Sequence, residues 1–164
     1  MLRTAASIAA LALAAVALTS CASEPEPEWT EEEAYAAAEE TFRGYWSVDA
    51  FSDDEEARAQ TLEHITGDLR DHYDGDSVLD GHDVQARGES IIREFETTEY
   101  RTVGDQIVVE ATACIDDSAY ELNIDGKGWK VPREDPIYGV ELTFESVDSK
   151  ILISHFDETE LEGC

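Results

Sequence analysis

The sequence has no apolar run long enough to cross a bilayer and very few basic residues. Its longest apolar stretch, residues 5–18, holds 14 residues, whereas a transmembrane helix needs about 20. Lys and Arg together number 11 in 164 residues, against 39 Asp and Glu, for a net charge of −28. Such a surface repels nucleic acid and anionic lipid head groups, so we exclude nucleic acid as a partner. Divalent cations, a basic protein partner or a saline habitat remain compatible with this charge.

No familiar catalytic or cofactor motif is present either. The sequence contains no Gly-x-Ser-x-Gly elbow, no phosphate-binding glycine loop, no Cys-x-x-Cys pair and no paired Cys–His constellation. It therefore predicts no catalytic residue, no cofactor and no metal site. These absences favour a protein that is not an enzyme and leave that question open.

The first 20 residues have the layout of a signal peptide. Arg3 supplies a short positive region, and the apolar stretch of residues 5–18 follows it. This stretch ends in Leu18-Thr19-Ser20-Cys21, which resembles the lipobox of bacterial lipoproteins. In that family the cysteine thiol receives diacylglycerol and the peptide is cut just before it. The alternative is an ordinary signal peptide with a chance cysteine near its end.

The lipobox resemblance implies three segments and a location. Residues 1–20 are the signal peptide, residues 21–29 carry the lipid on Cys21 and a Pro/Glu tether, and residues 30–164 form one α+β domain. Alternating Pro and Glu cannot build a core, and their like charges repel, so the tether is extended. Several acyl chains such as palmitate would hold the protein on the outer, extracytoplasmic face of the cell membrane.

The other two cysteines are expected to form a disulfide. Export places Cys114 and Cys164 in an oxidising compartment, where such a pair favours a structural cross-link. On the chain-entropy model, closing a loop of about fifty residues stabilises the fold by about 4 kcal/mol.

Two amphipathic helices are predicted first along the body. The sequence Thr30-Glu31-Glu32-Glu33 is a capping box, and an apolar stripe at helical spacing follows it, ending near residues 47–50. A second box at residues 52–55 opens another helix that continues to Tyr73, and Gly75 is its natural stop. Residues 75–88 are polar, contain three glycines and predict a long loop.

Antiparallel strands are predicted for the remainder, because the apolar period changes to two. On the second of these strands Ile107, Val109, Ala111, Ala113 and Ile115 share one face. The predicted strands cover residues 91–103, 106–115, 120–124, 138–144 and 150–157. Helices followed by an antiparallel sheet give an α+β architecture in which the N-terminal helices pack on the sheet.

This order of elements is similar to the nuclear transport factor-like cone fold, the superfamily that includes polyketide cyclase-like proteins. Small lipoproteins of actinobacterial type with such a body share a glycine turn before Trp-Lys-Val, here Gly128-Trp129-Lys130-Val131, with a mid-sheet and a C-terminal cysteine. The resemblance covers residues 30–164 and implies a curved sheet with a pocket between sheet and helices. A different two-layer α+β sandwich is the competing interpretation.

Three residues are candidates for lining such a pocket, namely Tyr35, Trp46 and His155. By alternation, His155 shares a face with Ile151 and Ile153, so it can point inward and act as a general base. The simpler interpretation makes His155 a surface residue and the two aromatic side chains part of the core. The acidic loop that contains Asp74, Asp76, Asp80 and Asp83 begins like a calcium loop but departs from that motif after three residues.

Three functions follow from these patterns. The first is a non-enzymatic module of the cell envelope that binds a small apolar ligand or an envelope protein. The second is a small pocket enzyme of the isomerase, cyclase or hydrolase type, which rests on fold analogy alone. The third is a divalent-cation binder built on the acidic loop. The sequence does not indicate the oligomeric state.

Overall fold

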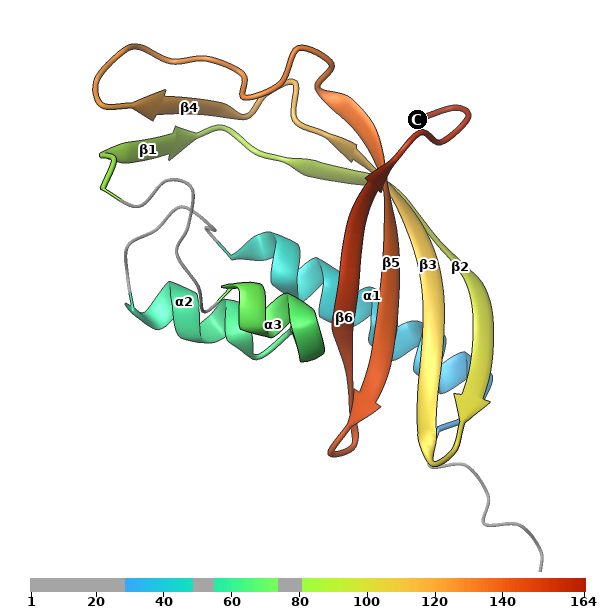
Figure 1. The fold of residues 1–164 in the computed structure, drawn as a ribbon. Helices are drawn as coiled ribbons and strands as arrows, with labels where there is room; N and C mark the ends of the chain where they lie inside the picture. Colours follow the sequence, from blue (N-terminus) through green and yellow to red (C-terminus); the bar gives the residue numbers. More distant parts are fainter. Residues whose placement is uncertain (1–28, 49–54, 74–80) are drawn as a thin grey trace, which may run out of the picture.

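The computed structural model describes residues 29–48, 55–73 and 81–164, and Figure 1 shows their arrangement. The signal peptide, Cys21, most of the tether, the first part of the second capping box and three of the four loop aspartates lie outside these residues. No helix in the described part of the chain is long and apolar enough to span a membrane. The elements in chain order are α1 (Glu31–Ser47), α2 (Glu55–Leu62), α3 (Gly67–Tyr73), β1 (Val84–Arg87), β2 (Ile91–Val103), β3 (Gln106–Asp116), β4 (Glu121–Ile124), β5 (Ile137–Val147) and β6 (Lys150–Thr159).

A curved four-stranded antiparallel sheet forms one layer, and helices form the other. The strand order is β2-β3-β5-β6, while β1 and β4 pair with each other in a separate two-stranded sheet. In Figure 1, α1 crosses one face of the large sheet and α3 lies beside β6. The α+β fold class predicted from the sequence, with N-terminal helices packed on a curved antiparallel sheet, is confirmed.

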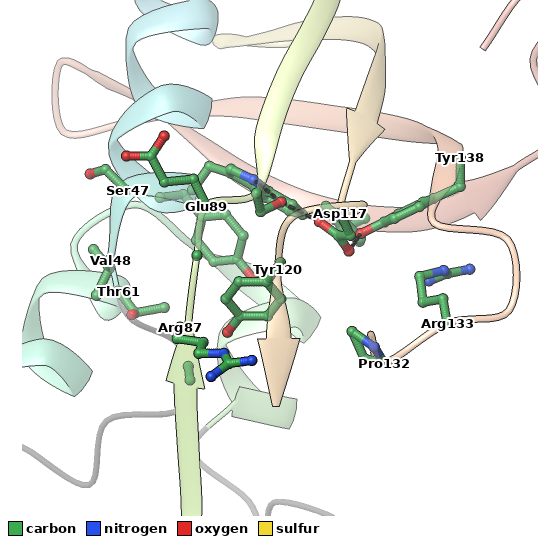
Figure 2. A pocket seen from close by; sticks show the side chains of 16 residues that line it. Ser47, Val48, Thr61, Arg87, Glu89, Asp117, Tyr120, Pro132, Arg133 and Tyr138 are labelled. Carbon is green, nitrogen blue, oxygen red and sulfur yellow. Dashed lines mark hydrogen bonds between the residues drawn. The ribbon is translucent and has the colours of Figure 1, made fainter. Parts of the chain in front are cut away.

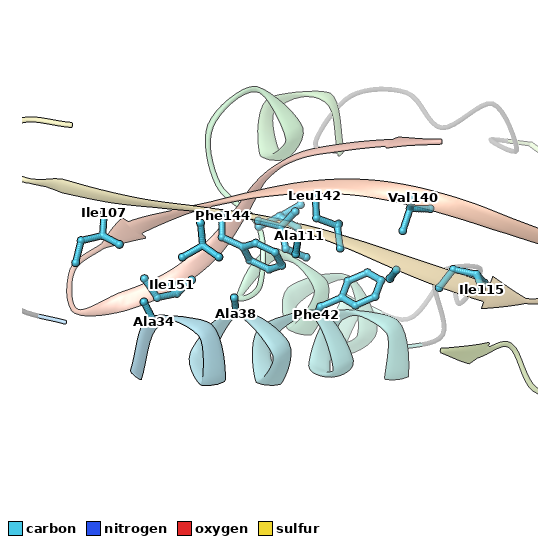
Figure 3. Close-up of a cluster of buried hydrophobic side chains, with 14 residues drawn as sticks. Ala34, Ala38, Phe42, Ile107, Ala111, Ile115, Val140, Leu142, Phe144 and Ile151 are labelled. Atoms are coloured by element: carbon cyan, nitrogen blue, oxygen red, sulfur yellow. The ribbon is translucent and has the colours of Figure 1, made fainter. Parts of the chain in front are cut away.

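The core lies between α1 and one face of the four-stranded sheet, to which β3, β5 and β6 contribute buried residues. All five residues predicted to share one face of β3 are buried, each at most 2 % exposed. Helix α1 presents Ala34, Ala38 and Phe42 to this face, as Figure 3 shows. The two alanines allow the helix to approach the sheet closely, and the Phe42 ring stacks on Phe95 with centroids 5.7 Å apart. Burying an aromatic side chain of this kind contributes about 2–3 kcal/mol.

The start of α1 is capped as the sequence predicts. The Thr30 hydroxyl oxygen accepts a hydrogen bond from the Glu33 amide at 3.3 Å, and the Thr30 amide donates to the Glu33 carboxylate at 3.0 Å. The bond from the Thr30 amide also lowers the pKa of the Glu33 carboxyl group. Two amides that would have no partner inside the helix are thereby satisfied.

The predicted second helix is wrong in one respect, because it is divided into α2 and α3: α2 ends at Leu62, and Ile65 leaves the helical path. This residue is completely buried and forms a parallel bridge with Ile153 of β6. The Thr66 amide donates to the Ile153 carbonyl at 2.8 Å, and the Ile153 amide donates to the His64 carbonyl at 2.9 Å. Gly67 then opens α3 with a φ of +57°. The edge of β6 offers unpaired backbone groups, and these bonds replace the helical ones at the break.

The predicted loop of residues 75–88 is also wrong at its end, where β1 forms. Val84 pairs with Ile124 and Arg87 pairs with Glu121 of β4. After the turn at residues 125–128, Lys130 forms one isolated bridge with Leu122 of β4. The apolar and polar residues of β1 do alternate, but four residues are too short a signal among three glycines, so the strand is specified by its pairing with β4.

Cys114 and Cys164 form the predicted disulfide, with their Cα atoms 5.4 Å apart. Cys114 lies on the sheet face opposite to the α1 core, since Ala113 and Ile115 on either side of it belong to that core. The cross-link therefore ties the C-terminal segment to the outer side of the sheet, next to Gly139 of β5.

Candidate functional site

A cavity of about 770 Å³ opens beyond the C-terminal end of α1, where the two sheets diverge (Figure 2). Seven parts of the chain form its wall: the end of α1, α2, the segment from β1 to the start of β2, the residues after β3, the loop before β5, β5, and β6. The lining includes Tyr45, Trp46, Ala86, Arg87, Glu89, Ser90, Asp117, Arg133, Tyr138 and Phe156.

One side of the cavity is aromatic. The rings of Trp46 and Phe156 are stacked, with centroids 6.2 Å apart and an interplanar angle of 14°. Tyr45 lies 6.4 Å from each of these two rings. Phe42 contacts Trp46 from the core side at 5.6 Å, so the aromatic side of the cavity continues into the hydrophobic core and its rings are held in place.

A bulge in β6 decides which side chain of this strand reaches the cavity. Phe144 pairs with Ile153 but Thr143 pairs with His155, so Ser154 is an extra residue without a partner in the register. After it, the even-numbered residues of β6 lie on the core side of the sheet in place of the odd-numbered ones. Phe156 therefore points inward. His155 is exposed on the outer face, where its Nε2 lies 2.8 Å from the Asp157 carboxylate. Of the two positions that the sequence allows for His155, the inward one is wrong and the surface one is observed, because strict alternation does not hold through a bulge.

A buried carboxylate forms the polar centre of the site. Asp117 is 6 % exposed, and Figure 2 shows its side chain between the connection to β2 and Tyr138 of β5. The Trp46 indole donates to the Ser90 hydroxyl oxygen at 2.9 Å, and the Ser90 hydroxyl donates to one oxygen of Asp117. The Tyr138 hydroxyl donates to the other oxygen at 3.2 Å. This chain of bonds links α1, the residue before β2, the residue after β3, and β5 around the cavity.

The environment of Tyr138 keeps its hydroxyl protonated. Burial raises the pKa of this phenol, and the negative charge of Asp117 raises it further. Both effects disfavour the phenolate form. Tyr138 is therefore a hydrogen-bond donor at ordinary pH and does not serve as a base.

Two arginines border the cavity, and each already has a carboxylate partner. The Arg133 guanidinium lies over the Tyr138 ring, 3.8 Å from its centroid. It also forms a bidentate ion pair with Glu158, in which Nη1 donates to Oε1 and Nη2 donates to Oε2 at 2.7 Å. This pair raises the pKa of Arg133 and lowers that of Glu158. Arg87 lies over the Trp129 ring at 4.2 Å and donates to Glu121 at 2.6 Å.

Of the three predicted pocket residues, only Trp46 lines the cavity. Tyr35 lies two turns or more before the cavity along α1 and packs edge-on against Tyr100, with centroids 6.4 Å apart. His155 is outside it, as described above. No group of His, Cys, Asp or Glu within the described ranges is arranged to hold a metal ion. Of the four aspartates of the acidic loop, Asp74, Asp76 and Asp80 lie outside those ranges, and Asp83 lies within them.

Sequence reasoning missed Ser90, Asp117 and Arg133. Asp117 is one of 39 acidic residues, and no local pattern distinguishes the one that becomes buried. A weak signal was available in the position of Asp117 directly after a strongly apolar strand. Tyr138 was placed correctly in a strand, but its role required knowledge of its neighbours.

No protein-family model and no curated protein matches this chain. Two solved structures are similar to it. The intermembrane space region of the chloroplast protein ARC6 has 13% sequence identity and a TM-score of 0.48, over 77% of this chain and 97% of that one. The putative transfer protein TraH from the Gram-positive conjugative plasmid pIP501 has 11% identity and a TM-score of 0.46, over 82% of this chain and 98% of that one.

Proposed function

We propose that this protein is an exported, lipid-anchored binding module whose cavity holds a small, partly apolar ligand. The observation that carries the proposal is the cavity itself. Its volume of about 770 Å³ lies within the range of about 300–1,000 Å³ that is typical of small-molecule sites. An aromatic wall with a few convergent polar groups is also the usual composition of such sites.

The membrane location is part of the same proposal and rests on the lipobox around Cys21. We also propose that residues 30–164 resemble the nuclear transport factor-like cone proteins, because the helices and strands follow one another in the same order. A cavity between the sheet and the end of the helix layer is compatible with that resemblance, although Phe42 and Phe144 fill the centre of the sheet.

Binding has more support than catalysis. An acid–base enzyme needs a group that can exchange a proton with the substrate. Both oxygens of Asp117 accept bonds from protein hydroxyls, and Tyr138 remains protonated. The site as described is therefore organised to present fixed donors, acceptors and rings.

The lipid anchor is tested by replacing its cysteine. We expect Cys21→Ala to move the protein from the membrane fraction to the medium, because the thiol that carries the acyl chains is absent. Fractionation and immunoblotting measure this, and metabolic labelling with palmitate should mark the wild-type chain only. Membrane retention of unlabelled Cys21→Ala would contradict the proposal.

Ligand binding is tested with N-phenyl-1-naphthylamine, a neutral apolar dye that fluoresces when it is bound. We expect saturable binding to the wild-type protein and at least a tenfold loss of affinity in Ala86→Phe, because the added ring occupies the cavity. Gln85→Phe is the matched control, since the preceding residue of β1 is exposed and does not line the cavity.

The two variants also separate specific binding from surface adsorption. Gln85→Phe should bind the dye with wild-type affinity, and thermal melts should show that both variants are folded. Equal binding by both variants would place the dye elsewhere and overturn the proposed site.

A further inference from the structure

We propose that the ligand of this cavity is an organic cation, an alkylated ammonium group attached to an apolar body. This inference rests on the proposed binding function and adds the charge of the ligand. Three observations carry it: the balance of charges around the cavity, the burial of Asp117 and the arrangement of the aromatic rings.

The charges around the cavity leave an excess of carboxylate. Arg133 is engaged by Glu158 and Arg87 by Glu121, so neither arginine presents an uncompensated positive charge. Glu89 and Asp117 also line the cavity, and neither forms an ion pair with a basic group in the described ranges. The lining itself holds two arginines and two carboxylates, but both arginines are already paired with carboxylates outside the lining, Glu121 and Glu158. An anionic ligand would meet a negative wall.

Asp117 is the carboxylate that most needs a positive partner. It is 6 % exposed, and its oxygens accept hydrogen bonds from the neutral hydroxyls of Ser90 and Tyr138. Arg133 is close enough to interact electrostatically with Asp117, but no basic group in the described ranges forms an ion pair or hydrogen bond with it. A buried carboxylate without a directly bonded cation is costly. An ammonium group in the cavity would compensate this charge, and the hydroxyl donors would hold the carboxylate in place for it.

The aromatic rings provide the second attraction. Cations bind over the faces of aromatic rings, and Trp and Tyr are the best of these. The wall already holds one guanidinium group in this manner, Arg133 over the Tyr138 ring. The cavity is also lined by Tyr45, Trp46 and Phe156. A methylated ammonium group, which is weakly hydrated, suits this combination of rings and one buried carboxylate.

The net negative charge of the chain favours the approach of a cationic ligand but does not specify where the ligand binds. A charge of −28 attracts cations over the whole surface and raises their encounter rate at low ionic strength. Specific binding requires in addition that the cation loses affinity when the cavity carboxylate is neutralised. An exposed carboxylate elsewhere should have no such effect.

The test uses three compounds of similar shape and different charge: benzyltrimethylammonium, phenylmethanesulfonamide and phenylmethanesulfonate. Titrations are followed by two-dimensional NMR of the full domain. The indole N–H of Trp46 is the reporter, because it lies in the wall and donates to Ser90. We expect the cation to bind at least tenfold more tightly than the sulfonate, with the sulfonamide between them.

The variants assign this preference to the cavity. Asp117→Asn should weaken cation binding about tenfold, and Glu89→Gln, an exposed position that leaves the fold intact, should weaken it about threefold. Asp157→Asn is the matched control, since this aspartate is exposed on the outer face of β6 and is absent from the cavity. Its cation affinity should equal that of the wild type.

The outcomes are distinct for the two proposals. If the neutral dye binds but the sulfonate binds as tightly as the cation, or if both cavity variants behave like Asp157→Asn, the organic-cation inference is wrong and the binding function stands. If neither the dye nor any of the three compounds shifts the Trp46 signal, both proposals fail.

Discussion

Replacing Gly88 with alanine should cause the largest loss of stability of any small substitution in this chain. Gly88 connects β1 to β2 with a φ of +83°, a conformation that costs an L-residue about 1–2 kcal/mol. A Cβ atom there would also overlap the carbonyl oxygen of Ala119 and lie 2.9 Å from its carbonyl carbon. Both atoms belong to backbone, so two segments must separate to make room.

We expect Gly88→Ala to lower the free energy of unfolding by about 2–5 kcal/mol, the combined cost of the backbone conformation and of overpacking. The melting temperature should fall by roughly 10 °C or more. Because Gly88, Glu89 and Ser90 form one wall of the cavity, the dye affinity should fall as well. Urea unfolding and dye titration of the same preparation measure both effects.

Gly81→Ala is the control that isolates the clash. Gly81 has a nearly identical φ of +85°, but nothing lies within 4 Å of the position of its Cβ atom. We expect this variant to lose only the conformational cost of about 1–2 kcal/mol and to keep its dye affinity. If the two variants lose equal stability, the close approach between Gly88 and Ala119 is not important for the fold.

Removing the disulfide with the double substitution Cys114→Ser and Cys164→Ser should cause a loss of stability of similar size. The cross-link closes a loop of 50 residues, and on the chain-entropy model its absence destabilises the protein by about 4 kcal/mol. The melting temperature should fall by roughly 15 °C. Differential scanning calorimetry of the wild-type and double-serine proteins measures the difference.

The reductant dithiothreitol provides the matched control. It should lower the melting temperature of the wild-type protein towards that of the double-serine variant and leave the variant unchanged. A wild-type melting temperature that does not respond to full reduction, checked by thiol titration, would contradict the proposed contribution. The cavity should be less affected than the stability, because neither cysteine lines it.

The C-terminal segment should be the first part of the chain to loosen after reduction. Leu161 packs against Gly139, where an added Cβ atom would approach the Leu161 Cδ1 atom to 2.8 Å. Glu158, three residues earlier, holds Arg133 at the border of the cavity. The disulfide and this ion pair therefore anchor successive parts of the same segment.

Much of the secondary structure was determined by the sequence alone, because the relevant signals are local. The capping box at Thr30 and Glu33, the five alternating residues of β3 and the hairpin turn at Gly104 each specify their own conformation through near neighbours. The pairing of the two cysteines followed from their number and the expected compartment. These features need no information about distant parts of the chain.

The break at Ile65, the strand β1 and the inward position of Phe156 were decided only by the tertiary structure. In the first two cases an edge strand supplies hydrogen bonds that compete with the local preference: β6 for Ile65 and β4 for β1. In the third, the bulge at Ser154 reverses the faces of all later residues in β6. Ile65 and Ile153 are far apart in the sequence, and so are β1 and β4. The bulge lies within β6 itself, but no sequence pattern marks its position.

The candidate site is the clearest example of this division. Trp46, Ser90, Asp117 and Tyr138 come from four separate segments spread over more than ninety residues, and no local sequence pattern marks any of them. The sequence by itself specified an acidic α+β domain whose C-terminus is held by a disulfide, and it predicts a lipid anchor. Which of its many carboxylates becomes buried beside aromatic rings depends on how the layers meet, since burial is a property of the packed chain and not of the residue.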